Sequence, residues 1–247
     1  MGRKYTKPPL IEAVCEFIFT PATAWDPSGP ERIYDKVKHA FPREEKRVIQ
    51  ELEVTQTPEG LKQALKSSDR WVFLSEDGNE FVQVDSRLLA INRLKPYLSW
   101  EAFKPHIELA FRSVMDVLGI HDIQRIGLRY INRIEIPSMS VTLDDYFDFR
   151  PYTGDRLPKE MSAFRLGSLF AFQEGRDVCK VELANAIAER LETTAFVLDI
   201  DYFLSEPQVV PPDQALSWAA QAHGQVESVF ESCVTDRLRA LFGEVLQ

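Results

Sequence analysis

The stretch that decides the fold is Ile126-Gly127-Leu128-Arg129-Tyr130-Ile131-Asn132-Arg133-Ile134-Glu135-Ile136, at the middle of the chain. Side chains alternate between the two faces of a β-strand, so Arg129 and Arg133 share one face and the large apolar residues share the other. A strand with two arginines on one face requires acidic neighbours, and Glu12 and Glu16 near the start of the chain supply them. We therefore predict that these two segments are adjacent strands of one sheet.

The charge pattern also suggests how the two strands align. An antiparallel arrangement would place Glu12 opposite Arg133 and Glu16 opposite Arg129, which is favourable for cross-strand pairs. A parallel arrangement matches equally well, so the pattern predicts adjacency and leaves the direction open. Each large buried side chain contributes roughly 1.5–3 kcal/mol and each Glu/Arg pair ~0.2–1 kcal/mol. The apolar face therefore drives folding, and the charged face sets the register.

Composition limits the class of protein. The chain has 247 residues, of which 45% are hydrophobic, and can bury a sizeable core. Its net charge of −9 opposes long-range attraction to nucleic acid, so we expect no such partner unless residues 3–7 or 43–47 form a basic face. The three cysteines are far apart, and no apolar run approaches the ~20 residues of a membrane span. We expect a cytoplasmic protein with reduced thiols and no membrane contact.

The first half of the chain reads as a strand, a helix, several antiparallel strands and a second helix. A proline-rich loop at 21–30 follows the first strand, Asp77-Gly78-Asn79 has the composition of a hairpin turn, and Ser99 and Gly119 are suited to begin and end the second helix. The predicted elements are a strand at 10–20, a helix at 31–41, strands at 47–57, 61–75 and 80–94, and a helix at 100–118.

The second half repeats this order after the central strand. Thr142 to Phe147 resembles a capped short helix. Strands are predicted at 162–173, 177–191 and 195–203. From Pro211 to Phe242, apolar residues keep a 3.6-residue period for about eight turns, which predicts one long helix.

The two halves therefore predict a duplicated α+β unit. The units are residues 1–120 and 121–247, in one compact domain or as two tightly packed halves. A pseudo-two-fold would bring the first strand of each half together at the centre of a largely antiparallel sheet with helices on one face. Sequence identity between the halves is slight, so this prediction concerns the order of elements only.

One resemblance covers nearly the whole chain. The segment Pro8 to Phe19, the motif Arg129-Tyr130-Ile131-Asn132-Arg133-Ile134 and the ending Phe230 to Gly243 are similar to the signature of a sporadically distributed prokaryotic family of about 250 residues. The scattered distribution of that family points to mobile or defence-associated genes. The resemblance implies no activity and transfers no catalytic residue.

The sequence carries no motif of a known catalytic class. It lacks G-x-S-x-G, H-E-x-x-H and a glycine-rich phosphate loop, so we predict no catalytic residue, no metal and no cofactor. Of four histidines, His223 lies on the apolar stripe of the last helix, one turn before Glu227, with which it could pair. We interpret His223 as a hydrogen-bonded residue of the core or its rim, in preference to a ligand or base.

Five residues are candidates for binding: Glu12, Glu16, Arg129, Arg133 and Trp25. The arginines could grip a carboxylate or phosphate in two-pronged fashion, and the alternative, which we favour, is a structural ladder of ion pairs. Trp25 lies in the proline-rich loop and could contact a partner, although packing over a core edge is the favoured interpretation.

Two further groups of polar residues need an explanation. Asp199 and Asp201, with Glu182, have the composition of a metal cluster, but two acids on one strand face are more often solvated. Asn132 and Tyr130 point to the side that helices are expected to cover, so we expect Asn132 to bind backbone or a buried neighbour.

Two functions remain open from the sequence. The first is a non-enzymatic module that binds another protein, or a second copy of itself, through an uncovered sheet face, the proline-rich loop or a long helix. The second is a sensor or enzyme for a small anion or nucleotide, with a pocket between the halves and Arg129 and Arg133 as anion clamps.

Overall fold

The computed structural model describes residues 3–20, 25–57, 60–158 and 161–243, and gives the backbone alone for 51–57 and 60–66. Its strands are β1 (Leu10–Phe19), β2 (Arg43–Thr57), β3 (Gly60–Leu74), β4 (Glu80–Val84), β5 (Leu88–Leu94), β6 (Ile123–Ile136), β7 (Arg165–Phe172), β8 (Asp177–Ala186) and β9 (Thr194–Leu204). Its α-helices are α1 (Gly29–Val37), α2 (Trp100–Leu118), α3 (Ala215–Cys233) and α4 (Asp236–Phe242). Short 3₁₀ turns are η1 (Leu143–Asp145), η2 (Gln173–Gly175) and η3 (Pro212–Gln214).

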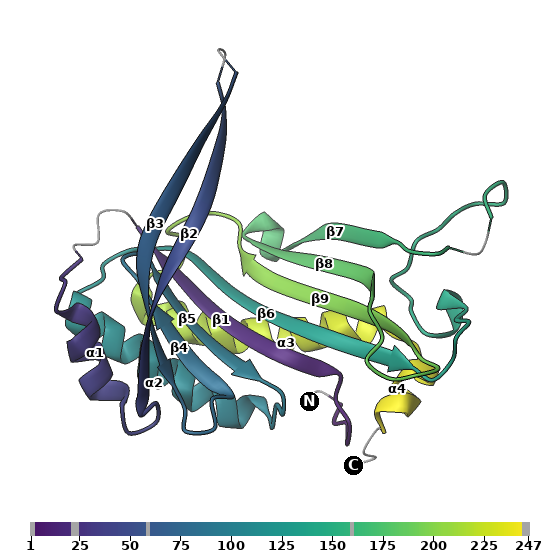
Figure 1. The fold of residues 1–247 in the computed structure, drawn as a ribbon, viewed down its shortest axis with the longest axis horizontal. Helices are drawn as coiled ribbons and strands as arrows, with labels where there is room; N and C mark the ends of the chain where they lie inside the picture. The colour runs from purple at the N-terminus through teal and green to yellow at the C-terminus, as the bar shows by residue number, and fades with distance from the viewer. Residues whose placement is uncertain (1–2, 21–24, 58–59, 159–160, 244–247) are drawn as a thin grey trace.

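All nine strands belong to one antiparallel sheet with the order β2-β3-β4-β5-β1-β6-β9-β8-β7 (Figure 1). The predicted neighbours β1 and β6 lie side by side at its centre and run antiparallel, so their adjacency is confirmed and their direction decided. The α+β class is confirmed as well. Each central strand is followed outward by the last strand of its own half, but the duplication of an α+β unit stays a prediction.

The predicted register between the two central strands is wrong by two residues. Glu12 lies opposite Ile131 rather than Arg133, and Glu16 lies opposite Gly127 rather than Arg129. A shift of two keeps every side chain on its predicted face, because the side-chain period of a strand is two. Glu16 consequently pairs with Arg125, the next arginine on the same face.

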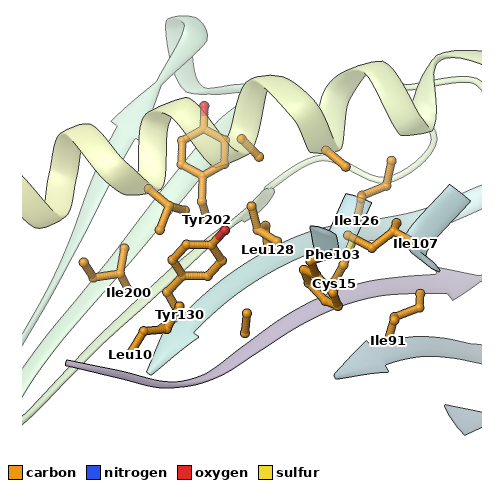
Figure 2. Packing of buried hydrophobic residues seen from close by; sticks show 14 of the residues in the cluster. Leu10, Cys15, Ile91, Phe103, Ile107, Ile126, Leu128, Tyr130, Ile200 and Tyr202 are labelled. Atoms are coloured by element: carbon orange, nitrogen blue, oxygen red, sulfur yellow. The ribbon is translucent and has the colours of Figure 1, made fainter. Parts of the chain in front are cut away.

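The core lies between the sheet and its helices. Ala13, Cys15, Phe17 and Leu128 are fully buried on the face that α2 and α3 cover, as their alternation predicts. Figure 2 shows Tyr130 and Tyr202 directed from the sheet toward helix α3. Asn132 is buried there too, and its amide donates to the carbonyl oxygen of Leu198 at 3.2 Å, so its expected backbone partner is present.

Local capping fixes helix α2 at both predicted ends. The Ser99 hydroxyl accepts from the Ala102 backbone N–H, and Gly119 adopts a left-handed conformation with φ 59° after the last turn. Several bounds differ from prediction: β2 begins at Arg43 rather than 47, β7 begins at Arg165 rather than 162, and the helix predicted at 31–41 ends at Val37. The strand predicted at 80–94 is interrupted because the buried Asp85 carboxylate accepts from the N–H groups of Arg87 and Leu88 and closes a turn. The strand predicted at 177–191 ends at Ala186.

The single long helix predicted from 211 to 242 is wrong. The chain leaves the helix at Val234, which is extended and forms a β-bridge with Phe147. Thr235 then caps a new helix, α4, by accepting from the Leu238 N–H. None of the helices in the described part of the chain has the length and apolar character needed to cross a membrane. Residues 21–24 of the predicted proline-rich loop lie outside the described residues.

A long hairpin arm extends from one side of the sheet. Strands β2 and β3 pair continuously from Arg43 opposite Leu74 to Thr57 opposite Gly60. Strand β4 pairs with residues 71–74 of β3 only, so the remainder of the hairpin projects away from the body (Figure 1).

Substitution by alanine should have opposite effects on stability at Gly119, which ends α2, and at Gly224, within α3. Gly119→Ala should lower the free energy of unfolding by about 1–2 kcal/mol, because the left-handed conformation is strained for any residue with a Cβ. Gly224→Ala, within α3 and with open space around it, should raise it by about 0.5–1 kcal/mol. Urea unfolding of both variants tests this, and equal signs would contradict the assigned helix end.

Candidate functional site

A cavity of about 520 Å³ opens on the helix-covered side of the sheet, where the two halves meet. Residues from both halves line it. The first half contributes the segment before β1 and the turn that leads into α2, and the second half contributes β6 and α3. This volume is typical of a pocket for a small molecule.

A chain of hydrogen bonds crosses the cavity. The hydroxyl of Tyr130, on β6, lies 3.0 Å from the Tyr97 hydroxyl and 2.9 Å from His223 Nδ1. On the other side of the imidazole, Nε2 lies 3.4 Å from the Glu227 carboxylate. The carboxylate favours the tautomer with its proton on Nε2, so Nδ1 accepts from Tyr130 and Tyr130 accepts from Tyr97. The predicted pairing of His223 with Glu227 is confirmed.

The imidazole of His223 is held neutral. Burial lowers its pKa to about 4, far enough that the ring carries no charge at pH 7. Trp100 stacks on it with ring centroids 4.5 Å apart and an interplanar angle of 10°. The predicted interpretation of His223 as a hydrogen-bonded residue at the rim of the core is confirmed, and its partners come from three different elements.

Three carboxylates line the same cavity: Glu101, Glu227 and Glu231. Glu231 is compensated, since Arg239 Nε lies 2.8 Å away and the Tyr5 hydroxyl donates to it at 2.6 Å. Glu227 has no comparable cation among the described residues. Burial, together with repulsion from Glu101 and Glu231, raises the pKa of Glu227.

The cavity wall next to Glu231 is held in place by contacts between residues 6–7 and residues 242–243. The backbone N–H groups of Thr6 and Lys7 donate to the carbonyl oxygens of Gly243 and Phe242, each at 2.9 Å. A Cβ at Gly243 would meet the Thr6 hydroxyl, and the left-handed φ of 69° at this position also favours glycine. Tyr5 is thereby held against the edges of the Phe230 and Phe242 rings.

This arrangement has two chemical capacities. The chain from Tyr97 to Glu227 can pass a proton along hydrogen bonds without placing a charge on the buried tyrosines, whose pKa values burial raises. The aromatic walls also offer a place for a positive charge, as does Glu227, whose partner among the described residues is the neutral His223. Ser99, the serine of the cavity, is committed to the cap of α2.

The predicted binding residues on the central strands lie on the other face of the sheet. Glu12 accepts from the Asn92 amide at 2.8 Å, and Glu16 pairs with Arg125 at 2.5 Å. Arg129 is held in two-pronged fashion by Asp199, at 2.8 and 2.5 Å. The ion pairs therefore run across β1, β6 and β9, and the second acidic strand, β9, is the partner that the two-strand pattern omitted.

The remaining candidates lie in separate places: Arg133, Trp25, and the three acidic residues Glu182, Asp199 and Asp201. Arg133 binds Glu135 at 3.3 Å and Glu189 at 3.1 Å. Trp25 is partly buried and packs against the core. In the described part of the chain no group of three acidic, histidine or cysteine side chains is placed to hold a metal ion. Asp201 contacts Arg125 and Glu182 contacts Lys180.

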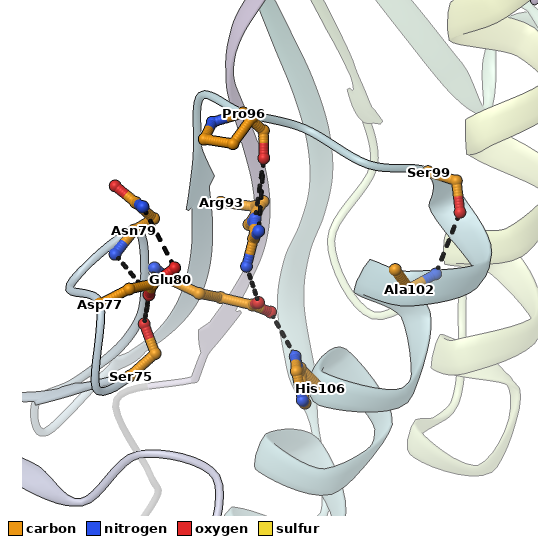
Figure 3. A network of polar contacts seen from close by, with 9 residues as sticks. All are labelled: Ser75, Asp77, Asn79, Glu80, Arg93, Pro96, Ser99, Ala102 and His106. Carbon is orange, nitrogen blue, oxygen red and sulfur yellow. Dashed lines mark hydrogen bonds and ion pairs between the residues drawn. The ribbon is translucent and has the colours of Figure 1, made fainter.

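A second polar cluster lies beneath the first turns of α2 (Figure 3). The buried Glu80 carboxylate pairs with Arg93 at 2.8 Å and with His106 Nδ1 at 2.6 Å. Arg93 in turn donates to the Pro96 carbonyl oxygen. The adjoining cavity is only about 120 Å³, so we interpret this cluster as a support that fixes the turn 95–99.

Sequence reasoning missed Tyr5, Tyr97 and Trp100 as residues of the site. Tyr97 and Trp100 flank the Ser99 cap, and the pattern aromatic-x-Ser-aromatic before a helix could have drawn attention to them. Tyr5 gave no signal, because its partners are about 230 positions away. Comparison of the chain with protein-family models and with curated proteins finds no match.

The neutral imidazole predicts a pH-dependent stability. Unfolded histidine takes up a proton near pH 6.5 and folded His223 near pH 4, so the unfolded state binds more protons between these values. Stability due to this residue should therefore fall as the pH drops through this window, by about 1–2 kcal/mol for a partly solvated group. His223→Asn should remove that fall when unfolding is followed by urea at several pH values.

The matched control is His39→Asn, which changes an exposed histidine of the first half. It should keep the wild-type pH profile. A His223→Asn profile parallel to that of the wild type would show that the imidazole is not held neutral by its site.

Proposed function

We propose that the chain is a non-enzymatic binding module whose cavity accepts a small organic cation with an apolar body. The observation that carries this proposal is Glu227, a carboxylate that is half-buried beside Glu101 and Glu231 and faces only a neutral imidazole among the described residues. A bound ammonium or guanidinium group would offset this repulsion. The expected effect is a lower pKa for Glu227 in the complex.

The walls of the cavity suit the rest of such a ligand. Tyr97, Trp100 and Phe230 offer aromatic surface, and the faces of aromatic rings attract cations. Arg3 and Lys4 line the opening, where the first lies 3.7 Å from Glu231. Arg3 and Arg239 both stand beside Glu231, so the carboxylate left for a ligand's positive charge is Glu227, whose partner among the described residues is a neutral imidazole.

This proposal differs from an anion site built on Arg129 and Arg133. Those guanidinium groups face the opposite side of the sheet and are already held by Asp199, Glu135 and Glu189. An incoming phosphate would have to displace these carboxylates. A cavity between the halves remains part of the proposal, but the charge of its ligand is reversed, and the duplication of the halves remains a proposal with it.

A matched series of three small molecules tests the charge preference. Phenethylamine, 2-phenylethanol and phenylacetate share one ring and chain and differ in charge at pH 7. Only the ammonium should stabilise the protein; at 100 times its Kd it adds about 2.7 kcal/mol, a shift in Tm of about 5–10 °C. Stabilisation by phenylacetate or by inorganic phosphate, without any by phenethylamine, would overturn the proposal.

Glu227→Gln tests the residue directly. It removes the charge with little change of shape and should weaken phenethylamine binding about tenfold in calorimetric titration, equivalent to ~1.4 kcal/mol. Binding to the wild type should also weaken as the pH falls through the raised pKa of Glu227. The control is Glu206→Gln, an exposed carboxylate outside the cavity lining, which should bind as the wild type does. Equal affinity in both variants would contradict a role for Glu227.

A further inference from the structure

Strand β7 forms one edge of the sheet and is poorly protected. Within the described residues, β8 pairs along its inner side and no strand pairs along its outer side (Figure 1). Its residues from Leu166 to Phe172 carry no charge and no proline. Leu169 is 68% exposed and Phe170 is 43% exposed. An uncharged edge with exposed large side chains is a template for pairing with another strand.

The opposite edge of the same sheet is protected. Strand β2 begins with the charged run Arg43-Glu44-Glu45-Lys46-Arg47, and Lys46 and Arg47 are held in ion pairs with Asp69 and Glu45. Charged side chains of this kind prevent association of sheet edges. The difference between the two edges indicates that β7 is left open for a partner.

We propose that β7 pairs antiparallel with β7 of a second copy of this chain, which joins two nine-stranded sheets into one. The strand is complementary to itself. When two copies pair about Leu169, Leu166 lies opposite Phe172 and Ser168 opposite Phe170, so every pair from 166 to 172 is uncharged. The one charged residue, Arg165, falls opposite Gln173 beyond the end of β7.

This register also matches the two faces of the sheet. Leu166, Phe170 and Phe172 lie opposite Leu183, Cys179 and Asp177 of β8, all of which are buried. With Leu169 opposite Leu169, these residues meet residues of the same face in the second copy, on the helix-covered side of both sheets. Leu169 itself meets Leu169 of the second copy on the other side, next to Lys180.

The net charge constrains how the two copies associate. Each carries −9, so they repel at long range, and the proposed contact contains no ion pair between residues 166 and 172. Dimerisation should therefore strengthen when NaCl rises from about 0.05 M to about 0.5 M, because salt screens the repulsion. A contact built on ion pairs would weaken instead.

Sedimentation equilibrium of the full chain tests the proposal. The wild type should show a concentration-dependent dimer, and Leu169→Lys, which places a charge at the centre of the edge, should be monomeric. Leu191→Lys makes the same change at a leucine that is 94% exposed in a loop and should dimerise as the wild type does. A wild type that stays monomeric at every concentration and salt, or a dimeric Leu169→Lys variant, would overturn the proposal.

Crosslinking tests the register. Leu169→Cys should form a covalent dimer on mild oxidation, since residues directly opposite have Cβ atoms about 4.5–5.5 Å apart and small movements allow a disulfide. The native thiols Cys15, Cys179 and Cys233 are buried, which keeps the background low. Leu191→Cys should stay monomeric under the same oxidation. Equal crosslinking of the two variants would show collision rather than a specific contact.

Discussion

The pairing of β1 with β6 is the contact on which the rest of the structure depends. It joins two segments that are more than 100 residues apart and completes one sheet from the strands of both halves. By placing Cys15 opposite Leu128 on one side and Val14 opposite Arg129 on the other, it separates a dry face from a charged one. The helices cover the dry face, and the cavity forms where α2 and α3 meet above this pair of strands.

Much of this arrangement follows from local signals in the sequence. Alternation predicts the faces of β1 and β6, and Ser99 and Gly119 predict the ends of α2, because both signals act over a few residues. The register could not be predicted, since arginines at 125, 129 and 133 share a face and offer equal partners to Glu16. The carboxylates of a third strand, β9, bind both Arg125 and Arg129, and of these two arginines Arg125 is the one that also reaches Glu16.

The last helix shows where a periodic pattern misleads. Apolar residues keep their helical spacing through Val234, yet this residue leaves the helix because its extended backbone pairs with Phe147. Thr235-Asp236 is a recognisable N-cap, but the 3.6-residue period overrode it in the prediction. Only part of the candidate site could be predicted from the sequence, because local patterns reveal only the contacts within one helix. His223 and Glu227 lie one turn apart and can be paired from sequence, whereas Trp100 and Tyr130 reach them only through the tertiary fold.

The contact of residues 6–7 with residues 242–243 bears on how the molecule is made. A ribosome releases the chain from its N-terminus onward, so β1 and the segment before it emerge long before α4 exists. Tyr5 therefore meets Glu231 only after 226 further residues have been made, and Phe242 later still. The sheet can assemble step by step as its strands emerge, but the cavity acquires its last wall only after α4 has emerged.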